Sequence, residues 1–423
     1  MKIKKFLPLM MVSALTACGT PAAPALYDTT VALEEGGKEE GTEEERRGQA
    51  TNILRSINSR IDFTKEGYSL PSTKLHAVLD VDMVGRVPTG GAMSSSQTAP
   101  TVTYSDFAVK GQVQLDLYHD DVTLPETPEE KMYLSSYVAL NLKDFNLSVS
   151  SNSMSFGVNN LNVSLYYFYD VKAEDGYVAV DFSDPSVKAN VLAIVRSMGA
   201  PEQIAQMLDV VFAPKEVEEG QTAGLGGKVI VGQKEVATML EGMIDAAKES
   251  GQEMAGAEQM QATVAILKQG DLVNYALSMA KSSMESTAMM KDPFDNIVNI
   301  VNATESLKFV RYETGANESG LVINLTGKDV VGESATEGFD FSLGAGMYFG
   351  TLTGASDVSL ERLQVKMRVS LPDNTHFQGE VKLSVDYKDK AKFNLPDLNQ
   401  FKDYSTLEDL NRLINNIVPP TGE

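Results

Sequence analysis

Tryptophan is absent from the 423-residue chain, and cysteine occurs only once, as Cys18. A single thiol supplies neither a disulfide framework within the chain nor a thiolate metal site. Histidine occurs three times, and the nearest metal candidate is His119 with Asp120 and Asp121. A metal site needs converging ligands, and a solvated turn is the ordinary explanation of this short run. The sequence therefore predicts no metal site and no cofactor.

Positive charge is scarce, with 36 Lys and Arg against 58 Asp and Glu and a formal net charge of −22. Such an acidic chain is repelled by nucleic-acid phosphates and by anionic head groups, so we expect neither as a direct partner. The charge is typical of an exported protein that stays soluble. The G-x-S-x-G, P-loop and H-E-x-x-H patterns are missing as well, and we predict a protein that is not an enzyme.

Long hydrophobic runs are also missing, since the apolar stretch at residues 6–14 is the most pronounced one. It is too short to cross a bilayer, which takes ~20 apolar residues. Three lysines precede it within residues 2–5, and small residues follow it up to Cys18. This order is typical of a secretory signal peptide.

The sequence Leu15-Thr16-Ala17-Cys18 resembles the lipobox of bacterial lipoproteins. In that family the cysteine thiol receives a diacylglycerol and the chain is cut just before it. The resemblance implies a signal peptide over residues 1–17, lipidation of Cys18, and a protein that is exported and anchored by lipid to the cell envelope. The membrane is then a partner through Cys18, while the type of envelope, the oligomeric state and any protein partner stay open.

Residues 18–47 predict a disordered acidic tether, because this stretch is rich in Glu and Gly and has little to bury. A folded body is expected over residues 48–423. It begins with an amphipathic helix, in which Ala50, Leu54, Ile57 and Ile61 recur at helical spacing.

Strands are predicted over about residues 74–182, where the hydrophobic period changes to two. Leu115 and Leu117, for example, alternate with Gln114 and Asp116, which indicates antiparallel strands with one wet and one dry face. Between residues 137 and 149 the apolar parity slips, and we predict a bulge or tight turn at Lys143-Asp144.

A helical insert is predicted over about residues 185–303, with Asp184-Pro185 and Asp292-Pro293 as helix starts. The acidic, then Gly-rich stretch 215–227 indicates a break between helices. Many methionines fall within this insert. Methionine suits a pliable apolar lining, although ordinary helix core explains the same residues.

A second block of strands is predicted over about residues 307–395, and a C-terminal helix over about residues 405–417 with Ser405 and Glu408 as a capping box. Within one of these strands, Gly344 and Gly346 indicate a bend, a bulge or the close approach of another backbone.

We therefore predict an α+β fold in which one curved, half-barrel-like antiparallel sheet is covered by the helical insertion, with N- and C-terminal helices. The alternative is two separate sheets, each of which needs its own cover. The order of elements behind the lipobox is similar to the LolA/LppX type of lipoprotein. That resemblance implies an open half-barrel under helices, with acyl chains held between them.

The function that follows is a lipid-anchored, exported binding protein that holds an apolar or lipid ligand between sheet and helices. The alternative is a structural or interaction lipoprotein with a solid core and no ligand. The predicted lining residues are Met239, Met243, Phe341, Leu343, Val365, Met367, Val381 and Leu383.

Overall fold

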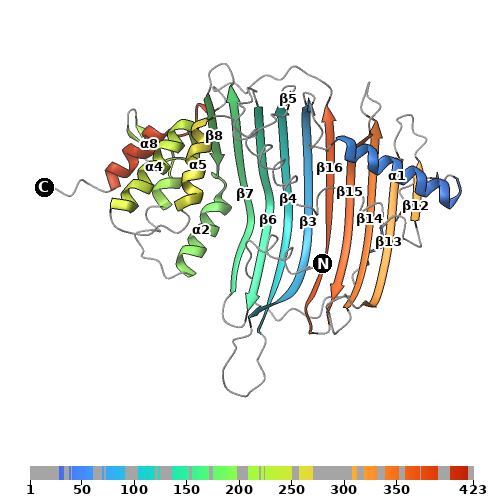
Figure 1. Cartoon of the computed structure of the whole chain (residues 1–423). Coiled ribbons are helices and arrows are strands. Elements are labelled where there is room, and N and C mark those ends of the chain that lie inside the picture. Colours follow the sequence, from blue (N-terminus) through green and yellow to red (C-terminus); the bar gives the residue numbers. More distant parts are fainter. Residues whose placement is uncertain are drawn as a thin grey trace.

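The computed structural model of the chain combines a large antiparallel sheet with several helices (Figure 1). The residues that it describes are 28–32, 38–39, 41–60, 69–70, 73–90, 103–119, 122–123, 136–151, 155–170, 175–197, 208–218, 221–222, 224–249, 257–269, 307–311, 319–330, 339–351, 358–371, 373–388 and 401–417.

The main sheet has twelve strands in the order β1-β12-β13-β14-β15-β16-β3-β4-β6-β7-β8-β11, and every neighbouring pair is antiparallel. Its strands are β1 (Lys38–Glu39), β3 (Thr73–Gly90), β4 (Thr103–His119), β6 (Ser136–Ser151), β7 (Ser155–Asp170), β8 (Asp175–Asp181), β11 (Lys228–Gly232), β12 (Leu307–Arg311), β13 (Ser319–Val330), β14 (Phe339–Thr351), β15 (Val358–Ser370) and β16 (His376–Lys388). Two small pairs stand apart from it: β2 (Ser69–Leu70) with β5 (Val122–Thr123), and β9 (Glu216–Glu218) with β10 (Gln221–Thr222).

The two predicted strand blocks form one sheet, because β16 of the second block pairs along its whole length with β3 of the first. Leu79 lies opposite Leu383 in this pairing, and Val81 lies opposite Val381. The sheet is curved and open, with β1 at one edge and β11 at the other. This part of the predicted fold is confirmed.

The described helices lie toward the two ends of the sheet (Figure 1). Helix α1 (Glu43–Arg60) packs near β12 and β15, whereas α2 (Pro185–Ser197) packs on β7 and α4 (Gln233–Glu249) packs on β8, β11 and α5 (Ala257–Gln269). Helix α8 (Leu407–Ile417) lies beside β10 and β11. The predicted Asp292-Pro293 helix start lies outside the described residues. A helical insert that covers the whole sheet therefore stays a prediction.

The predicted insert also contains a strand that the sequence did not reveal. β11 follows Gly226 and Gly227, both of which adopt positive φ (64° and 70°), and it extends the sheet beyond β8. Its Ile230 amide donates to the Ser405 carbonyl, and the Ser405 amide donates to the Lys228 carbonyl. Both backbone polar groups of Ser405 are thus used by the strand.

This use of Ser405 displaces the predicted C-terminal capping box by one residue. The Thr406 amide donates to Asp409 (2.9 Å), and the Asp409 amide donates to the Thr406 hydroxyl (3.3 Å). The start of α2 is as predicted, since Asp184 accepts a hydrogen bond from the Ser186 amide (2.8 Å). Capping side chains satisfy amides that have no partner in the first helical turn.

The parity slip in β6 is a β-bulge, as predicted. The register to β7 shifts between Leu142 and Phe145, and Asp144 adopts a φ of 48°. On the neighbouring strand a Cβ at Gly111 would lie 2.7 Å from the Phe145 Cα atom. The bulge in β6 therefore packs directly against Gly111 of β4, where a larger residue would not fit. Beyond the bulge, apolar side chains again occupy every second position of β6.

Three described stretches of the predicted tether over residues 18–47, namely 28–32, 38–39 and 41–47, belong to the folded structure. Asp28–Ala32 packs on β13, β14 and β15, and β1 pairs with β12. Helix α1 begins at Glu43, five residues before the predicted start of the body at residue 48. The Thr42 and Glu45 side chains form its capping box, in which the Thr42 amide donates to Glu45 (2.6 Å).

Candidate functional site

Alternation along the central strands places their apolar side chains on one surface. Opposite residues in the register match: Leu343 faces Met367, Val365 faces Val381, and so on across the sheet. We call this surface the apolar face, and over five strands it is formed by Phe341, Leu343, Ala345 and Met347 of β14, Leu363, Val365, Met367 and Val369 of β15, Phe377, Val381, Leu383 and Val385 of β16, Leu75, Ala77, Leu79 and Val81 of β3, and Val109, Val113, Leu115 and Leu117 of β4.

Six of the eight predicted lining residues lie together on this face. They occupy the three adjacent strands β14, β15 and β16, and all six are half-buried. Period-two alternation located them because successive side chains of a strand point to opposite faces. The six residues are Phe341, Leu343, Val365, Met367, Val381 and Leu383.

The other two predicted lining residues, Met239 and Met243, lie elsewhere. They sit one turn apart on α4, and their side chains are 40% and 53% exposed. Helix α4 packs on β8 and β11, and four strands separate β8 from β16. The helix core consists instead of Ala237 and Ile244, which pack against α5. The structure does not bring the two methionines to the six strand residues.

At the β12 end, α1 covers the apolar face. Leu54 is 1% exposed, and it clusters with Ala50, Phe309, Leu321 and Phe349. These side chains come from the helix and from three strands, so the cluster fixes the helix across the sheet. The helical spacing of Ala50 and Leu54 predicted which side of α1 is buried, and the structure shows what that side covers.

At the opposite end, a buried glutamine links the sheet to two helices. The Tyr167 hydroxyl donates to Gln233 Oε1 (3.1 Å), and Gln233 Nε2 donates to the Leu267 carbonyl of α5 (2.9 Å). Gln233 is 2% exposed, and a Cβ at Gly176 would lie 2.5 Å from its Oε1 atom. Sequence reasoning missed Gln233, because nothing in its neighbours distinguishes it from a solvated glutamine at a helix start.

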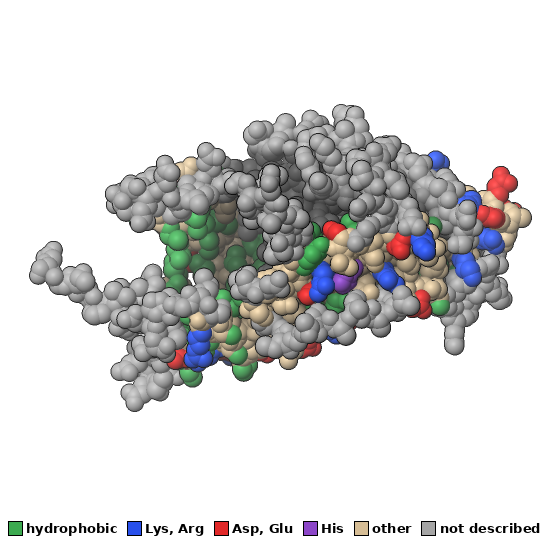
Figure 2. All heavy atoms as spheres, turned by 90° about the horizontal axis from the view of Figure 1, so that it is seen from below, with side chains coloured by type: hydrophobic (Ala, Val, Ile, Leu, Met, Phe, Trp, Pro, Cys, Tyr) green, Lys and Arg blue, Asp and Glu red, His purple; other side chains and the backbone are tan. Residues whose placement is uncertain are grey.

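The apolar face continues onto β6 and β7, where one large side chain is exposed. Leu165 lies opposite Leu140, which lies opposite Leu115 of β4. The Leu165 side chain is 38% exposed, whereas Tyr167 on the same strand face is buried. Seen from below, hydrophobic side chains line a hollow on the side of the molecule where α2, α4 and α5 lie (Figure 2).

The opposite surface of the central strands is polar and is held by cross-strand ion pairs. Arg86 contacts Asp106 through two nitrogens, at 2.6 and 2.9 Å, and Lys110 lies 2.6 Å from Asp82. Such partly exposed pairs contribute little free energy each. The charged residues of β3 and β4 thus pair with each other across the two strands, as expected on a solvent-exposed surface of a sheet.

An aromatic cluster covers this polar surface at β6–β8. Phe401 stacks on Phe168 with ring centroids 5.4 Å apart, and Tyr404 meets Phe401 edge-on. Burial raises the pKa of Tyr137 to about 12, and burial also raises the pKa of Tyr404. Both phenols are neutral near pH 7, and their rings pack within the cluster.

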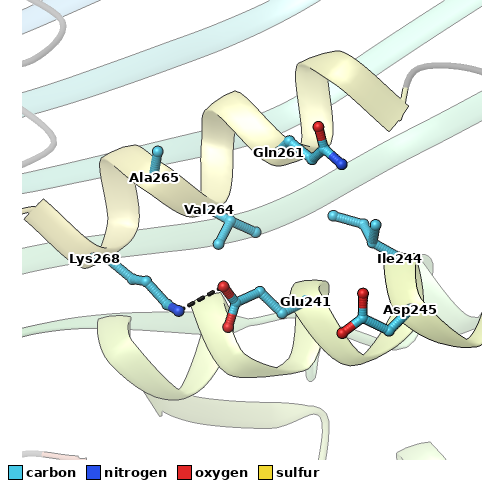
Figure 3. A pocket seen from close by; sticks show the side chains of 7 residues that line it. All are labelled: Glu241, Ile244, Asp245, Gln261, Val264, Ala265 and Lys268. Atoms are coloured by element: carbon cyan, nitrogen blue, oxygen red, sulfur yellow. Dashed lines mark hydrogen bonds and ion pairs between the residues drawn. The ribbon is translucent and has the colours of Figure 1, made fainter.

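A groove of about 450 Å³ runs between α4 and α5 (Figure 3). The Glu241 carboxylate and the Lys268 ammonium point toward each other across it at 2.5 Å, and Ile244 and Val264 form its floor. Within the described part of the chain, no three His, Cys, Asp or Glu side chains gather as metal ligands. Asp120 and Asp121, from the metal candidate that the sequence suggested, lie outside that part.

No family model, curated protein or solved structure matches the chain. None of the described helices combines the length and the hydrophobicity that a membrane crossing requires.

Proposed function

We propose that the protein is an exported, lipid-anchored binding protein that holds an apolar ligand, such as an acyl chain, against the apolar face. The observation that supports the ligand is the breadth of this face, which continues from β14 to β7 and whose side chains are mostly half-buried, with Leu165 exposed. Ligand sites are lined mainly by hydrophobic side chains, with few polar groups among them. Each CH₂ that a ligand buries there contributes about 0.8 kcal/mol.

The anchor rests on the Leu15-Thr16-Ala17-Cys18 sequence and its resemblance to the lipobox. Radiolabelled fatty acid should enter the expressed chain, and Cys18→Ser should abolish both the label and the fractionation with membranes. An unlabelled wild-type chain would overturn the anchor without touching the ligand proposal.

The ligand proposal is tested by native mass spectrometry and lipid extraction of the purified protein, followed by displacement of a fluorescent fatty acid. Leu165→Glu should weaken the binding of the fatty acid, because it places a charge on an apolar surface at a position exposed enough to tolerate it. Ser384→Glu, on the exposed polar surface of β16, is the matched control and should bind as the wild type does. Absence of both extracted lipid and fatty-acid binding would overturn the proposal.

A second candidate is the interaction lipoprotein without a ligand, and the exposed Met239 and Met243 favour it. Methionine adapts to varied partners, and these two side chains project away from the core of α4. Photo-crosslinking from position 243 in intact cells should then yield a discrete adduct, whereas Lys234, also exposed on α4, should yield none. If Met243 also gives no adduct while lipid is extracted, the first proposal stands alone.

A further inference from the structure

A short N-terminal segment lies across the polar surface of three strands. It consists of Asp28–Ala32, which we call the clasp, and within it Val31 is 3% and Thr29 is 7% exposed. The clasp is far in sequence from the strands that it contacts, since β13–β15 span residues 319–370. The sequence of the clasp is not strongly hydrophobic. Its burial therefore depends on specific contacts that the three strands provide.

One row of residues, directly opposite one another in the register, receives the clasp. Asn324 of β13 pairs with Gly344 of β14, which pairs with Lys366 of β15. The Val31 amide donates to Asn324 Oδ1 (2.9 Å), and Asn324 Nδ2 donates back to the Val31 carbonyl (3.2 Å). A side-chain amide thus satisfies both backbone groups of one residue, as a neighbouring strand would.

The glycines of β14 make room for this contact. A Cβ at Gly344 would lie 1.9 Å from the Thr29 carbonyl oxygen, and one at Gly346 would lie 3.0 Å from the Val31 side chain. The close approach of another backbone, one of the three explanations of these glycines, is therefore the correct one. On either side, the Thr29 hydroxyl contacts the Ser342 hydroxyl, and Lys366 Nζ donates to the Thr30 carbonyl (3.3 Å).

The clasp changes how far the body can lie from a lipid on Cys18. Only nine residues separate Cys18 from Asp28, so the two Cα atoms are at most ~35 Å apart, at ~3.5 Å per residue. A free tether that ran to residue 47 would allow ~100 Å. The attachment point also moves from the start of α1, on the apolar face, to the polar surface of β13–β15.

We propose that the clasp is the mechanical attachment of the lipid anchor, which holds the polar surface of the β13–β15 end next to the membrane and leaves the β7–β11 end farther away. This inference rests on the proposed lipidation of Cys18, not on the proposed ligand. The two ends are well separated, because seven strand spacings of ~4.8 Å lie between β13 and β7.

Disulfide trapping tests the clasp itself in the full-length, lipidated protein. Thr29→Cys with Ser342→Cys should lose both free thiols on mild oxidation, since the two hydroxyls are in contact and lipid blocks the only natural cysteine. Thr29→Cys with Ser384→Cys is the control pair and should keep both thiols. Two thiols that stay open to alkylation in the first pair would overturn the clasp.

Energy transfer tests the orientation, and the absence of tryptophan from the chain makes single reporters possible. In vesicles that contain dansyl-labelled lipid, Lys328→Trp on β13 should show strong transfer, whereas Lys402→Trp, beside Phe401 at the far end, should show little. Both lysines are exposed, so the substitutions are matched.

Val31→Asp should abolish the difference between the two reporters, because it places a charge in a buried position of the clasp while the sheet stays intact. Ala32→Asp, which is exposed, should preserve the difference. Equal transfer from both reporters with an intact clasp would overturn the orientation. The acyl mass of each sample is measured beforehand, so a failure of lipidation overturns the anchor separately, and the ligand proposal is unaffected by either result.

Discussion

At the scale of single residues, Asp144 determines how β6 passes the bulge. Its φ of 48° is a left-handed conformation in which the Cβ of most residues is crowded. Asparagine side chains hold the turn: the Asp144 amide donates to Asn162 (3.0 Å), and Asn146 donates to the Asp144 carbonyl (2.6 Å). These hydrogen bonds fix the backbone of position 144 at positive φ, so any residue placed there must adopt that conformation.

Substitutions at this position should separate backbone strain from side-chain chemistry. We expect Asp144→Val to lower the free energy of unfolding by about 1–2 kcal/mol, since a β-branched residue is disfavoured at positive φ. Asp144→Gly should leave it nearly unchanged, because glycine has no Cβ to crowd. Urea titration followed by circular dichroism measures both. A larger loss for glycine than for valine would contradict this explanation.

Asp409 couples the C-terminal helix to pH. Burial opposes its ionisation, but the hydrogen bonds from Thr406 and the Lys215 ammonium at 3.1 Å outweigh burial and lower its pKa. A carboxylate with a lowered pKa stabilises the folded state in full above about pH 5, and this contribution is lost as the pH falls through and below about 4.

Asp409→Asn should therefore reduce the free energy of unfolding by about 1 kcal/mol at pH 7, and this difference should narrow as the pH falls below about 4. Thermal unfolding of the wild type and the variant across this pH range measures the convergence. Asp403→Asn, at an exposed position three residues before Thr406, is the control and should change little at pH 7. A gap that stays constant with pH would argue against the role of the Asp409 charge.

At the scale of elements, α1 is a cover whose attachment depends on a few side chains. Leu54→Ala should cost about 2–5 kcal/mol, the usual loss for a buried leucine. Hydrogen exchange should accelerate in α1 and β12 but not in α4 or α5, which do not contact this cluster. Asn52→Ala, on the exposed side of α1, is the matched control. Uniform acceleration throughout the protein would show that α1 does not unfold as a local unit.

Elements with a repeated pattern could be predicted from the sequence, and elements without one could not. The long strands show period-two alternation, and even the bulge at Lys143-Asp144 is visible as a slip in that pattern. β11 was missed because it is five residues long and follows a Gly-Gly turn. The clasp was missed because Asp28–Ala32 has no periodicity, and its burial depends on Asn324 and on glycines some 300 residues later.

The same distinction applies to the candidate site. The shared face of six predicted lining residues could be foreseen because alternation assigns a face, and antiparallel pairing keeps neighbouring strands in phase. The position of Met239 and Met243 apart from these six could not be foreseen, because composition does not say which side of α4 packs on β8 and α5. Contacts with partners distant in sequence decide that question.

At the scale of the whole molecule, the pairing of β3 with β16 joins two halves that are distant in sequence. Val81 lies opposite Val381, three hundred residues along the chain. Contacts over such separations must close long loops before they are formed, so they slow folding. These contacts also join the two halves into one hydrogen-bonded sheet. A substitution that disturbs the β3–β16 pairing should therefore destabilise strands on both sides of it.

Gly379 is the position at which this prediction is most direct. A Cβ there would lie 2.5 Å from the Asp82 carbonyl oxygen and 2.7 Å from the Met83 Cα atom, both in the backbone of β3. Gly379→Ala should therefore displace the two strands and lower the free energy of unfolding by about 1–3 kcal/mol. Hydrogen exchange should accelerate in β4 and in β15 together. Gly48→Ala, where the added Cβ meets nothing within 4 Å, should be neutral or stabilising. If Gly379→Ala accelerated exchange in β15 and β16 while β4 kept its protection, the two halves would be separately folding units that merely lie edge to edge.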